Sequence, residues 1–224
     1  MSVTTFQRAR SAEQRAVRRA AILETAAAML TEMPVADLSL NELSRRVGLA
    51  KSNVLNYFES REAVLLELSS AELTAWVEDL AAALADVSPS QPIDERAQRL
   101  VDAAVGTLAE RPVFCDLVSA QASVLERNIS TETALTFKRA AAVSYGQMIS
   151  VVERVLPELG TERAGHFIAT ASLLAGAIWT HSHPVPAILA AYDADPSLTA
   201  IRMSFEPALT DSLRALLYGV LPRS

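Results

Sequence analysis

The sequence is poor in the residues that build β-structure and covalent cross-links. Among its 224 residues, aromatic side chains make up 5%, and there are seven glycines and one cysteine. Because Cys115 stands alone, an intramolecular disulfide framework and a cysteine-based zinc site are both excluded. Alanine and leucine dominate instead, and they favour helices over strands. We therefore expect an all-α protein rather than a β-sandwich or barrel.

Lysine is also scarce, and acidic residues outnumber basic ones. The formal net charge is −6, which by itself argues against a nucleic-acid partner, and only Lys51 and Lys138 are lysines. The charge is unevenly spread, however. Residues 1–60 carry eight basic and six acidic residues, a net of +2, whereas residues 61–224 carry twelve and twenty, a net of −8. This asymmetry predicts two domains with different partners, 1–60 and 61–224.

No Asp, Glu, Lys or Arg occurs between Ala164 and Tyr192, so this stretch could be read as a membrane-spanning helix. Three histidines, several hydroxyl residues, Pro184 and Pro186 interrupt it, and its apolar part, 167–179, is short for a bilayer. We expect a buried or interface helix here and keep a membrane-associated protein as an alternative. The polar N-terminus does not resemble a signal peptide, which favours a cytoplasmic location.

Motifs for catalysis are missing as well. The sequence has no glycine-rich phosphate loop, metal motif or nucleophile elbow, so we expect neither an enzyme nor a bound cofactor. His181 and His183 have the look of a metal pair, but no carboxylate or cysteine lies near them in sequence, and we expect no metal there. An all-α enzyme or small-molecule carrier remains the alternative.

Apolar periodicity and helix breakers predict helices along the whole chain. Ser39 is the expected N-cap of the second helix, with Glu42 placed as in a capping box, and Gly48 is its expected stop. Ser60 is the expected cap of a long fourth helix that ends near the loop 88–92. The other predicted helices span 15–31, 40–47, 51–57, 93–109, 112–127, 131–156, 161–182, 185–192 and 205–220.

The segment 39–61 places two short helices on either side of the turn 48–50. A turn this short fits a helix-turn-helix, whose second helix lies in the DNA major groove. The outward face of 51–57 is polar and holds no acidic residue; Asn suits adenine, and Lys suits guanine or phosphate. The same spacing also fits an ordinary pair of surface helices. The expected DNA contacts are Arg45, Arg46, Lys51, Ser52, Asn53, Asn56, Tyr57 and Arg61.

Residues 15–68 resemble the DNA-binding domain of TetR-type (tetracycline-repressor-like) regulators. The resemblance is carried by Ile22-Leu23 and Ala26, Ser39 with Leu43-Ser44, Val47-Gly48-Leu49, the run Lys51 to Phe58, and the run Ser60 to Leu65. It implies a three-helix helix-turn-helix domain followed by a helical domain that senses a ligand and dimerises. It also implies a homodimer, with a repressor's role, that binds a palindromic operator and is released by a small molecule.

The resemblance further implies roles for single residues. Ser39 would contact phosphate, Tyr57 would occupy the aromatic phosphate-contact position, and Arg61 would keep the charge of the usual Lys. The chain departs from the family pattern at Leu55, where Tyr is frequent, at Ala50, where Ser is usual, and at Pro34, where Gly is usual. Before this domain, the basic stretch 8–19 would add DNA contacts or form a solvated tail.

Two helices of the second domain are the expected dimer interface. Small residues recur along 161–182 at spacings of four, three and four, which allows close helix approach, and 205–220 offers a leucine stripe. Two such helices from each subunit would form a four-helix bundle with a twofold axis; packing inside one subunit is the alternative. The expected interface residues are Gly165, Ala169, Ser172, Gly176, Leu209, Leu213, Leu216 and Leu217.

A ligand cavity is expected among the helices after residue 92, apolar with a few polar groups. Ordinary core packing is the alternative for each lining residue. The candidates are Phe114, Cys115, Leu117, Gln121, Phe137, Tyr145, Met148 and Trp179.

Overall fold

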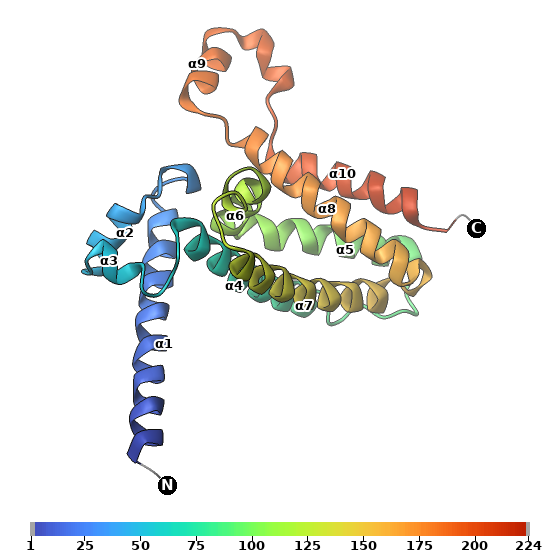
Figure 1. The fold of residues 1–224 in the computed structure, drawn as a ribbon. Coiled ribbons are helices and arrows are strands. Elements are labelled where there is room, and N and C mark those ends of the chain that lie inside the picture. The colour runs from blue at the N-terminus through green and yellow to red at the C-terminus, as the bar shows by residue number, and fades with distance from the viewer. Residues whose placement is uncertain (1–2, 223–224) are drawn as a thin grey trace. The chain divides into compact units, whose positions relative to one another are not determined.

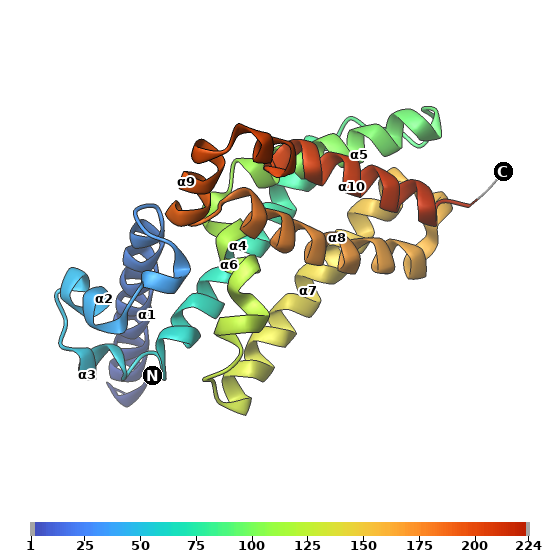
Figure 2. The ribbon, with the colours of Figure 1, turned by 90° about the horizontal axis from the view of Figure 1, so that it is seen from above.

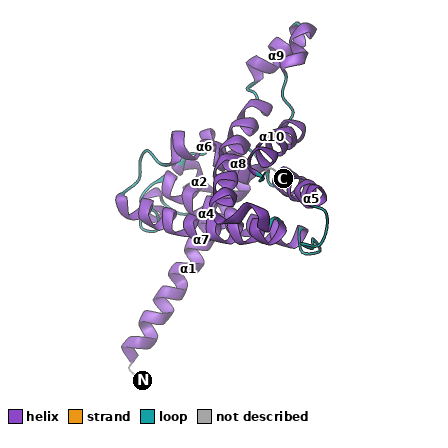
Figure 3. Cartoon of the chain, turned by 90° about the vertical axis from the view of Figure 1, so that its right-hand side faces the viewer, coloured by secondary structure: helices purple, strands orange, loops and turns teal. Residues whose placement is uncertain are grey.

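A computed structural model describes the backbone of residues 3–222 and the side chains of residues 13–222, and every regular element in that range is helical (Figures 1 and 3). The all-α prediction is confirmed. The α-helices are α1 (Val3–Leu30), α2 (Leu40–Val47), α3 (Lys51–Val54), α4 (Arg61–Ala83), α5 (Ile93–Ala109), α6 (Pro112–Ala120), α7 (Thr131–Val155), α8 (Gly160–Ser182), α9 (Pro186–Ala194) and α10 (Phe205–Val220).

Most helix boundaries follow from local signals in the sequence. The bounds of α2, α5 and α10 coincide with the predicted ones, and α7 and α8 differ by one residue. Three predictions need correction. Helix α1 starts at Val3, so the basic stretch 8–19 is helical rather than a tail; α3 ends at Val54 instead of Tyr57; and 112–127 divides into α6 and the π-helical turn η2 (Gln121–Leu125).

The chain forms two compact units. The first comprises residues 1–71 and 120–137, and the second comprises 72–119 and 138–224. The division falls inside α4 and α7, each of which contributes residues to both units, and the expected boundary at residue 60 remains a prediction.

In the first unit, apolar residues of α1, α2, α3 and α4 share one core. Ile22, Leu43, Val54 and Leu65 are each fully buried. The segment 120–137 joins this unit through Glu59, whose carboxylate accepts a hydrogen bond from the Ser130 backbone N–H at 2.7 Å. The Ser130 backbone and side chain lower the pKa of Glu59, because both donate to its ionised form.

The second unit packs α5, α6, α8 and α10 with the adjoining parts of α4 and α7 around one apolar core. Helix α10 lies along α8 and also contacts α5 (Figure 2). Buried Arg96 of α5 joins this helix to the end of α7 and the turn after it, since it donates to the Val155 carbonyl at 2.7 Å and to Glu158 at 2.6 and 3.0 Å. None of the helices in the described range is long and apolar enough to cross a membrane.

Candidate nucleic-acid interface

Helix α2 begins and ends at two residues that the sequence singles out. Ser39 caps α2, because its hydroxyl accepts a hydrogen bond from the Glu42 N–H at 3.2 Å. Gly48 ends the helix at φ 74°, a left-handed conformation that glycine adopts without steric cost. The Leu49 N–H then bonds to the Ser44 carbonyl at 3.0 Å and closes the turn. These bonds fix the direction in which α3 leaves α2.

Helix α3 and the residues that follow it, 55–58, present a polar surface opposite their buried side, which we call the recognition surface. Val54 is fully buried and Phe58 is 3% exposed, which anchors this segment in the core. The residues predicted to read DNA lie on the other side, where Lys51, Ser52, Asn53 and Asn56 are exposed and Tyr57 is half-buried.

Sequence reasoning missed one apolar member of the same surface. Leu55 is 42% exposed and lies between the two asparagines in sequence. An exposed aliphatic side chain on a recognition helix can contact a thymine methyl group. The substitution of the frequent Tyr by Leu therefore changes the kind of contact available at this position, from a hydroxyl to an apolar one.

The two arginines of α2 are paired within their own helix. The Glu42 carboxylate accepts hydrogen bonds from Arg45 at 2.6 and 2.8 Å and from Arg46 at 3.0 Å, and these donors lower the pKa of Glu42 to about 2. Arg46 also bonds to Glu32 at 2.7 Å and its side chain is 28% exposed, whereas that of Arg45 is 73% exposed. Arg45 is therefore the more accessible phosphate ligand of the two.

Arg61 has partners within its own chain. Its guanidinium donates to the Val35 carbonyl and lies 3.6 Å from the Glu62 carboxylate, and the side chain is 20% exposed. The residue ties the start of α4 to the turn η1 (Val35–Asp37), and its contact with phosphate stays a prediction.

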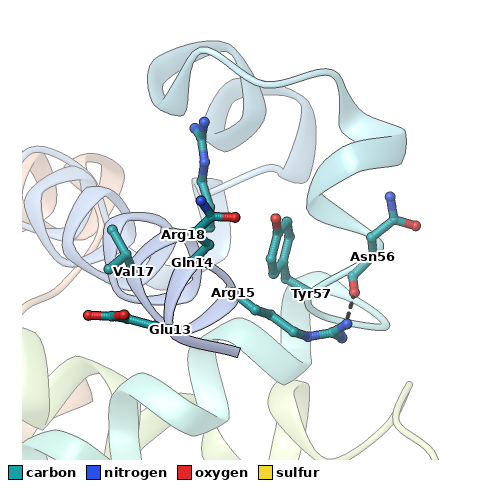
Figure 4. A pocket seen from close by; sticks show the side chains of 7 residues that line it. All are labelled: Glu13, Gln14, Arg15, Val17, Arg18, Asn56 and Tyr57. Atoms are coloured by element: carbon teal, nitrogen blue, oxygen red, sulfur yellow. Dashed lines mark hydrogen bonds between the residues drawn. The ribbon is translucent and has the colours of Figure 1, made fainter. Parts of the chain in front are cut away.

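Helix α1 borders the recognition surface. A hollow of about 660 Å³ lies between α1 and the turn after α3 (Figure 4). Arg15 reaches across it, and its Nη2 donates to the Asn56 carbonyl at 2.9 Å. The hollow is lined by Glu13, Gln14, Arg15, Val17, Arg18, Asn56 and Tyr57. The side chains of Arg8 and Arg10, also part of the predicted basic stretch, lie outside the described residues.

The candidate ligand-pocket residues occupy several different environments. Phe114, Cys115, Met148 and Trp179 belong to the core of the second unit, and Tyr145 packs against that core while donating to the Gly165 carbonyl. Leu117 of the same unit is fully buried. Gln121 and Phe137 belong to the first unit, where Gln121 donates to Glu126 at 2.9 Å. The assignment of these eight residues to one cavity stays a prediction.

The predicted dimer stripe is mostly committed to the chain's own packing. A Cβ atom on Gly176 would lie 3.4 Å from Val118 and Ser119 of α6, and one on Gly165 would lie 3.3 Å from the Tyr145 hydroxyl. Leu209, Leu213 and Leu217 of α10 are at most 2% exposed. We therefore correct these five assignments: the small residues let α8 approach its own neighbours, and the leucines fill the core.

The two remaining members of the α8 stripe do face outward. Ala169 and Ser172 are exposed, and Leu173 beside them is 76% exposed; Leu216 of α10 is partly buried. Near the end of α8, the His183 ring stacks on Trp179 with ring centroids 3.8 Å apart. Across the described residues, no group of three or more metal-ligating side chains could hold an ion.

Comparison with protein families accounts for nearly the whole chain. A model described as bacterial regulatory proteins of the tetR family matches residues 22–68, and a tetracyclin repressor-like C-terminal domain model matches residues 70–224. The second match alone spans more than half of the sequence. This chain belongs to the TetR family of regulators. The family is one of transcriptional regulators rather than of enzymes.

Individual relatives agree with this assignment. The chain is similar to the HTH-type transcriptional regulator EthR of Mycobacterium tuberculosis, with 43% identity over 51 residues, which is 23% of this chain and 24% of the relative. The solved structure of the fatty acid degradation regulator FadR from Bacillus halodurans matches with a TM-score of 0.54 at 16% identity, covering 90% of this chain and 98% of that one.

A second solved structure is similar over a comparable length. NalD, described as the secondary repressor of the MexAB-OprM multidrug efflux pump in Pseudomonas aeruginosa, matches with a TM-score of 0.52 at 17% identity. The match covers 95% of this chain and all of NalD. Likeness at this level of identity concerns the fold.

Proposed function

We propose that this protein is a ligand-responsive DNA-binding transcriptional repressor that binds a palindromic operator as a homodimer. The observation that carries the proposal is the exposed surface of α3 and of the turn after it, where Lys51, Ser52, Asn53 and Asn56 are all exposed. Amide side chains suit adenine and lysine suits guanine or phosphate, so these residues can read base edges in a major groove. Such a partner places the protein with the chromosome, in the cytoplasm.

Phosphate contacts would orient α3 without specifying sequence. Ser39 is exposed at the start of α2, and its hydroxyl proton is free to be donated because the oxygen is the acceptor of the capping bond. Arg45 is exposed on the same helix. In this arrangement Ser39 and Arg45 would bind phosphates of the DNA backbone while the residues of α3 contact bases in the major groove.

Homodimerisation would supply the twofold symmetry that a palindromic operator needs. The outward face of α8, which includes Ala169, Ser172, Leu173 and Ala177, carries one large exposed apolar side chain among small ones. Two copies of this face, with α10 beside each, would form a four-helix bundle. Leu173 would leave water on assembly, whereas the leucines of α10 already lie in the core.

The effector would be a small molecule that binds the second unit and shifts the protein toward a state that does not bind DNA. A thermal-shift screen of apolar and polar metabolites tests this part, because a ligand that binds the native state raises its stability. A compound that both stabilises the protein and weakens DNA binding is the expected result.

An electrophoretic mobility shift on DNA upstream of the protein's own gene tests the proposal as a whole. We expect a complex that is selective against scrambled competitor DNA and weakens as salt concentration rises. Absence of sequence-selective binding in ligand-free protein would refute it. That result, combined with small-molecule binding or turnover, would favour the alternative of an all-α carrier or enzyme.

A further inference from the structure

Helix α3 is too short to hold its own position. It comprises four residues, and its N-cap, Ala50, makes no side-chain capping bond. A single helical turn is not stable alone, because one or two hydrogen bonds do not repay the ordering of the backbone. The residues that follow, 55–58, continue as turns that lead into Phe58. Contacts from another element are therefore needed to hold the backbone of Asn56 and Tyr57 in position for DNA.

Two arginines one helical turn apart on α1 supply that support. Arg15 donates to the Asn56 carbonyl at 2.9 Å, and its guanidinium carbon lies 5.6 Å from the centre of the Tyr57 ring. Arg19 donates to the next carbonyl, that of Tyr57, and its guanidinium carbon lies 4.1 Å from the centre of the Phe58 ring. The consecutive carbonyls of Asn56 and Tyr57 thus accept hydrogen bonds from donors on one face of α1.

The second of these arginines is itself held in place. The Glu67 carboxylate of α4 accepts two hydrogen bonds from Arg19, one from Nε at 2.9 Å and one from Nη2. A bidentate pair of this kind fixes the plane of the guanidinium as well as its position. Arg19 therefore lies between two fixed groups, and its side chain is 36% exposed.

Arg18 provides the contrast. It is exposed, and no hydrogen bond or ion pair joins it to another of the described side chains. In Figure 4 it extends away from Asn56 and Arg15. A free, exposed guanidinium at the rim of the recognition surface is available to a phosphate, whereas Arg15 donates from Nη2 to Asn56 and all three nitrogens of Arg19 donate to Tyr57 or Glu67.

We propose that Arg15 and Arg19 are positioning residues for DNA recognition, which fix the backbone of Asn56 and Tyr57, and that Arg18 is the phosphate contact among these three. The proposal rests on the proposed DNA-binding function and assigns to α1 a part in sequence selectivity. It gives Arg15 and Arg19 a different role from Arg18, although the three contribute equally to the net charge.

Binding of full-length variants to an operator duplex and to a scrambled duplex across a salt series distinguishes the two roles. For Arg15→Ala we expect operator affinity to fall about tenfold, as for loss of a charge-assisted hydrogen bond, with little change in scrambled-DNA affinity or in salt dependence. For Arg18→Ala, its neighbour and matched control, we expect both affinities to fall and the log–log salt slope to weaken by about 0.9 for each phosphate that is no longer neutralised. Salt slopes that fall for Arg15→Ala as for Arg18→Ala would overturn the proposal.

Glu67→Gln gives an independent test through the partner of Arg19. If Arg19 bound phosphate, removal of a nearby negative charge would strengthen binding to any duplex. If Arg19 positions the turn, the change loosens it, and operator affinity falls while scrambled-DNA affinity does not. Tighter binding by Glu67→Gln would therefore contradict the proposal.

A measurement without DNA separates this inference from the proposed function. Amide hydrogen exchange of residues 51–58 should speed up in Arg15→Ala and remain as in the wild type in Arg18→Ala, since only the former loses a bond to this turn. Unchanged protection in both variants would refute the positioning role even if the protein binds its operator. Faster exchange in a protein that binds no operator would refute the proposed function instead.

Discussion

The outward face of α8 makes a quantitative prediction about assembly. Leu173 is 76% exposed in the single chain, and full burial of a leucine side chain contributes about 1.5–3 kcal/mol. If dimerisation buries what is now exposed, each copy contributes about 1–2 kcal/mol, and the twofold interface about 2–4 kcal/mol. Leu173→Ala should therefore raise the dimer dissociation constant by about 30- to 700-fold, at 1.4 kcal/mol for each factor of ten.

The substitution isolates assembly from folding. Alanine and leucine are both good helix formers, and an exposed side chain leaves no cavity when it is shortened, so the subunit should keep its helicity. Sedimentation equilibrium over a range of concentrations measures the dissociation constant directly. Val143→Ala is the matched control, because Val143 of α7 is 65% exposed and lies on a helix outside the proposed bundle.

A dissociation constant that is unchanged by Leu173→Ala, or raised equally by Val143→Ala, would refute this assignment of the interface. Substitution of Gly176, suggested by the small-residue stripe, would not serve as a test. Its side chain would press on Ser119 of α6 within the same chain, and the variant would lose folding stability whether or not it dimerised.

Three further predictions concern single groups. Asn53→Ala and Asn56→Ala should each weaken operator binding by about 1–3 kcal/mol if the amide reads a base; unchanged discrimination against base-pair variants would exclude them from base reading. Burial raises the pKa of Cys115 to about 12, so a thiol reagent at pH 8 should label it only after unfolding; rapid labelling of native protein would contradict its burial. NMR titration of Glu42 should give a midpoint near 2 that rises toward 4.5 in Arg45→Ala, which removes the largest cause of the shift, and the stability from this pairing should be complete above pH 4.5 and fall as the pH drops toward 2.

The sequence determines the helices well because their ends are local. Ser39, Gly48 and Ser60 stop or start helices through bonds to residues at most four positions away, and such signals can be read directly. The end of α3 is one boundary that such signals do not give. The segment from Lys51 to Tyr57 contains no helix breaker, yet α3 ends at Val54. The chain then continues in turns, with Val54 and Phe58 both buried in the core, before α4 begins.

The direction of a helix face is harder to predict, because it depends on packing between distant elements. The stripe of small residues on α8 correctly indicates close helix approach, yet nothing in its spacing says which helix approaches. Gly176 faces α6 and Gly165 faces Tyr145 of α7, both in the same chain. Leu209, Leu213 and Leu217 lie in the core for the same reason: α10 packs on α5 and α8.

Net charge alone is a poor measure of a DNA-binding surface, because some of its arginines are already paired with carboxylates. Residues 1–60 carry a net of +2, but Arg19 is paired with Glu67, which lies outside that range, and Arg46 with Glu32 and Glu42. These charges are neutralised before DNA arrives, and pairing them with phosphate would exchange one partner for another. Lys51 and Arg18 are exposed with no carboxylate partner among the described side chains. Each could therefore neutralise one DNA phosphate and release the counterion bound there.

A dimer that binds through these two cations of each subunit would neutralise about four phosphates, which corresponds to a log–log salt slope of about −4. The side chains of Arg8 and Arg10 are not included in this sum, and Arg8→Ala combined with Arg10→Ala measures their share. If that share is small, the slope of the double variant should remain at about −4. A slope near zero in the wild-type protein would mean that the basic front does not bind a DNA backbone, and both proposals for this surface would fail with it.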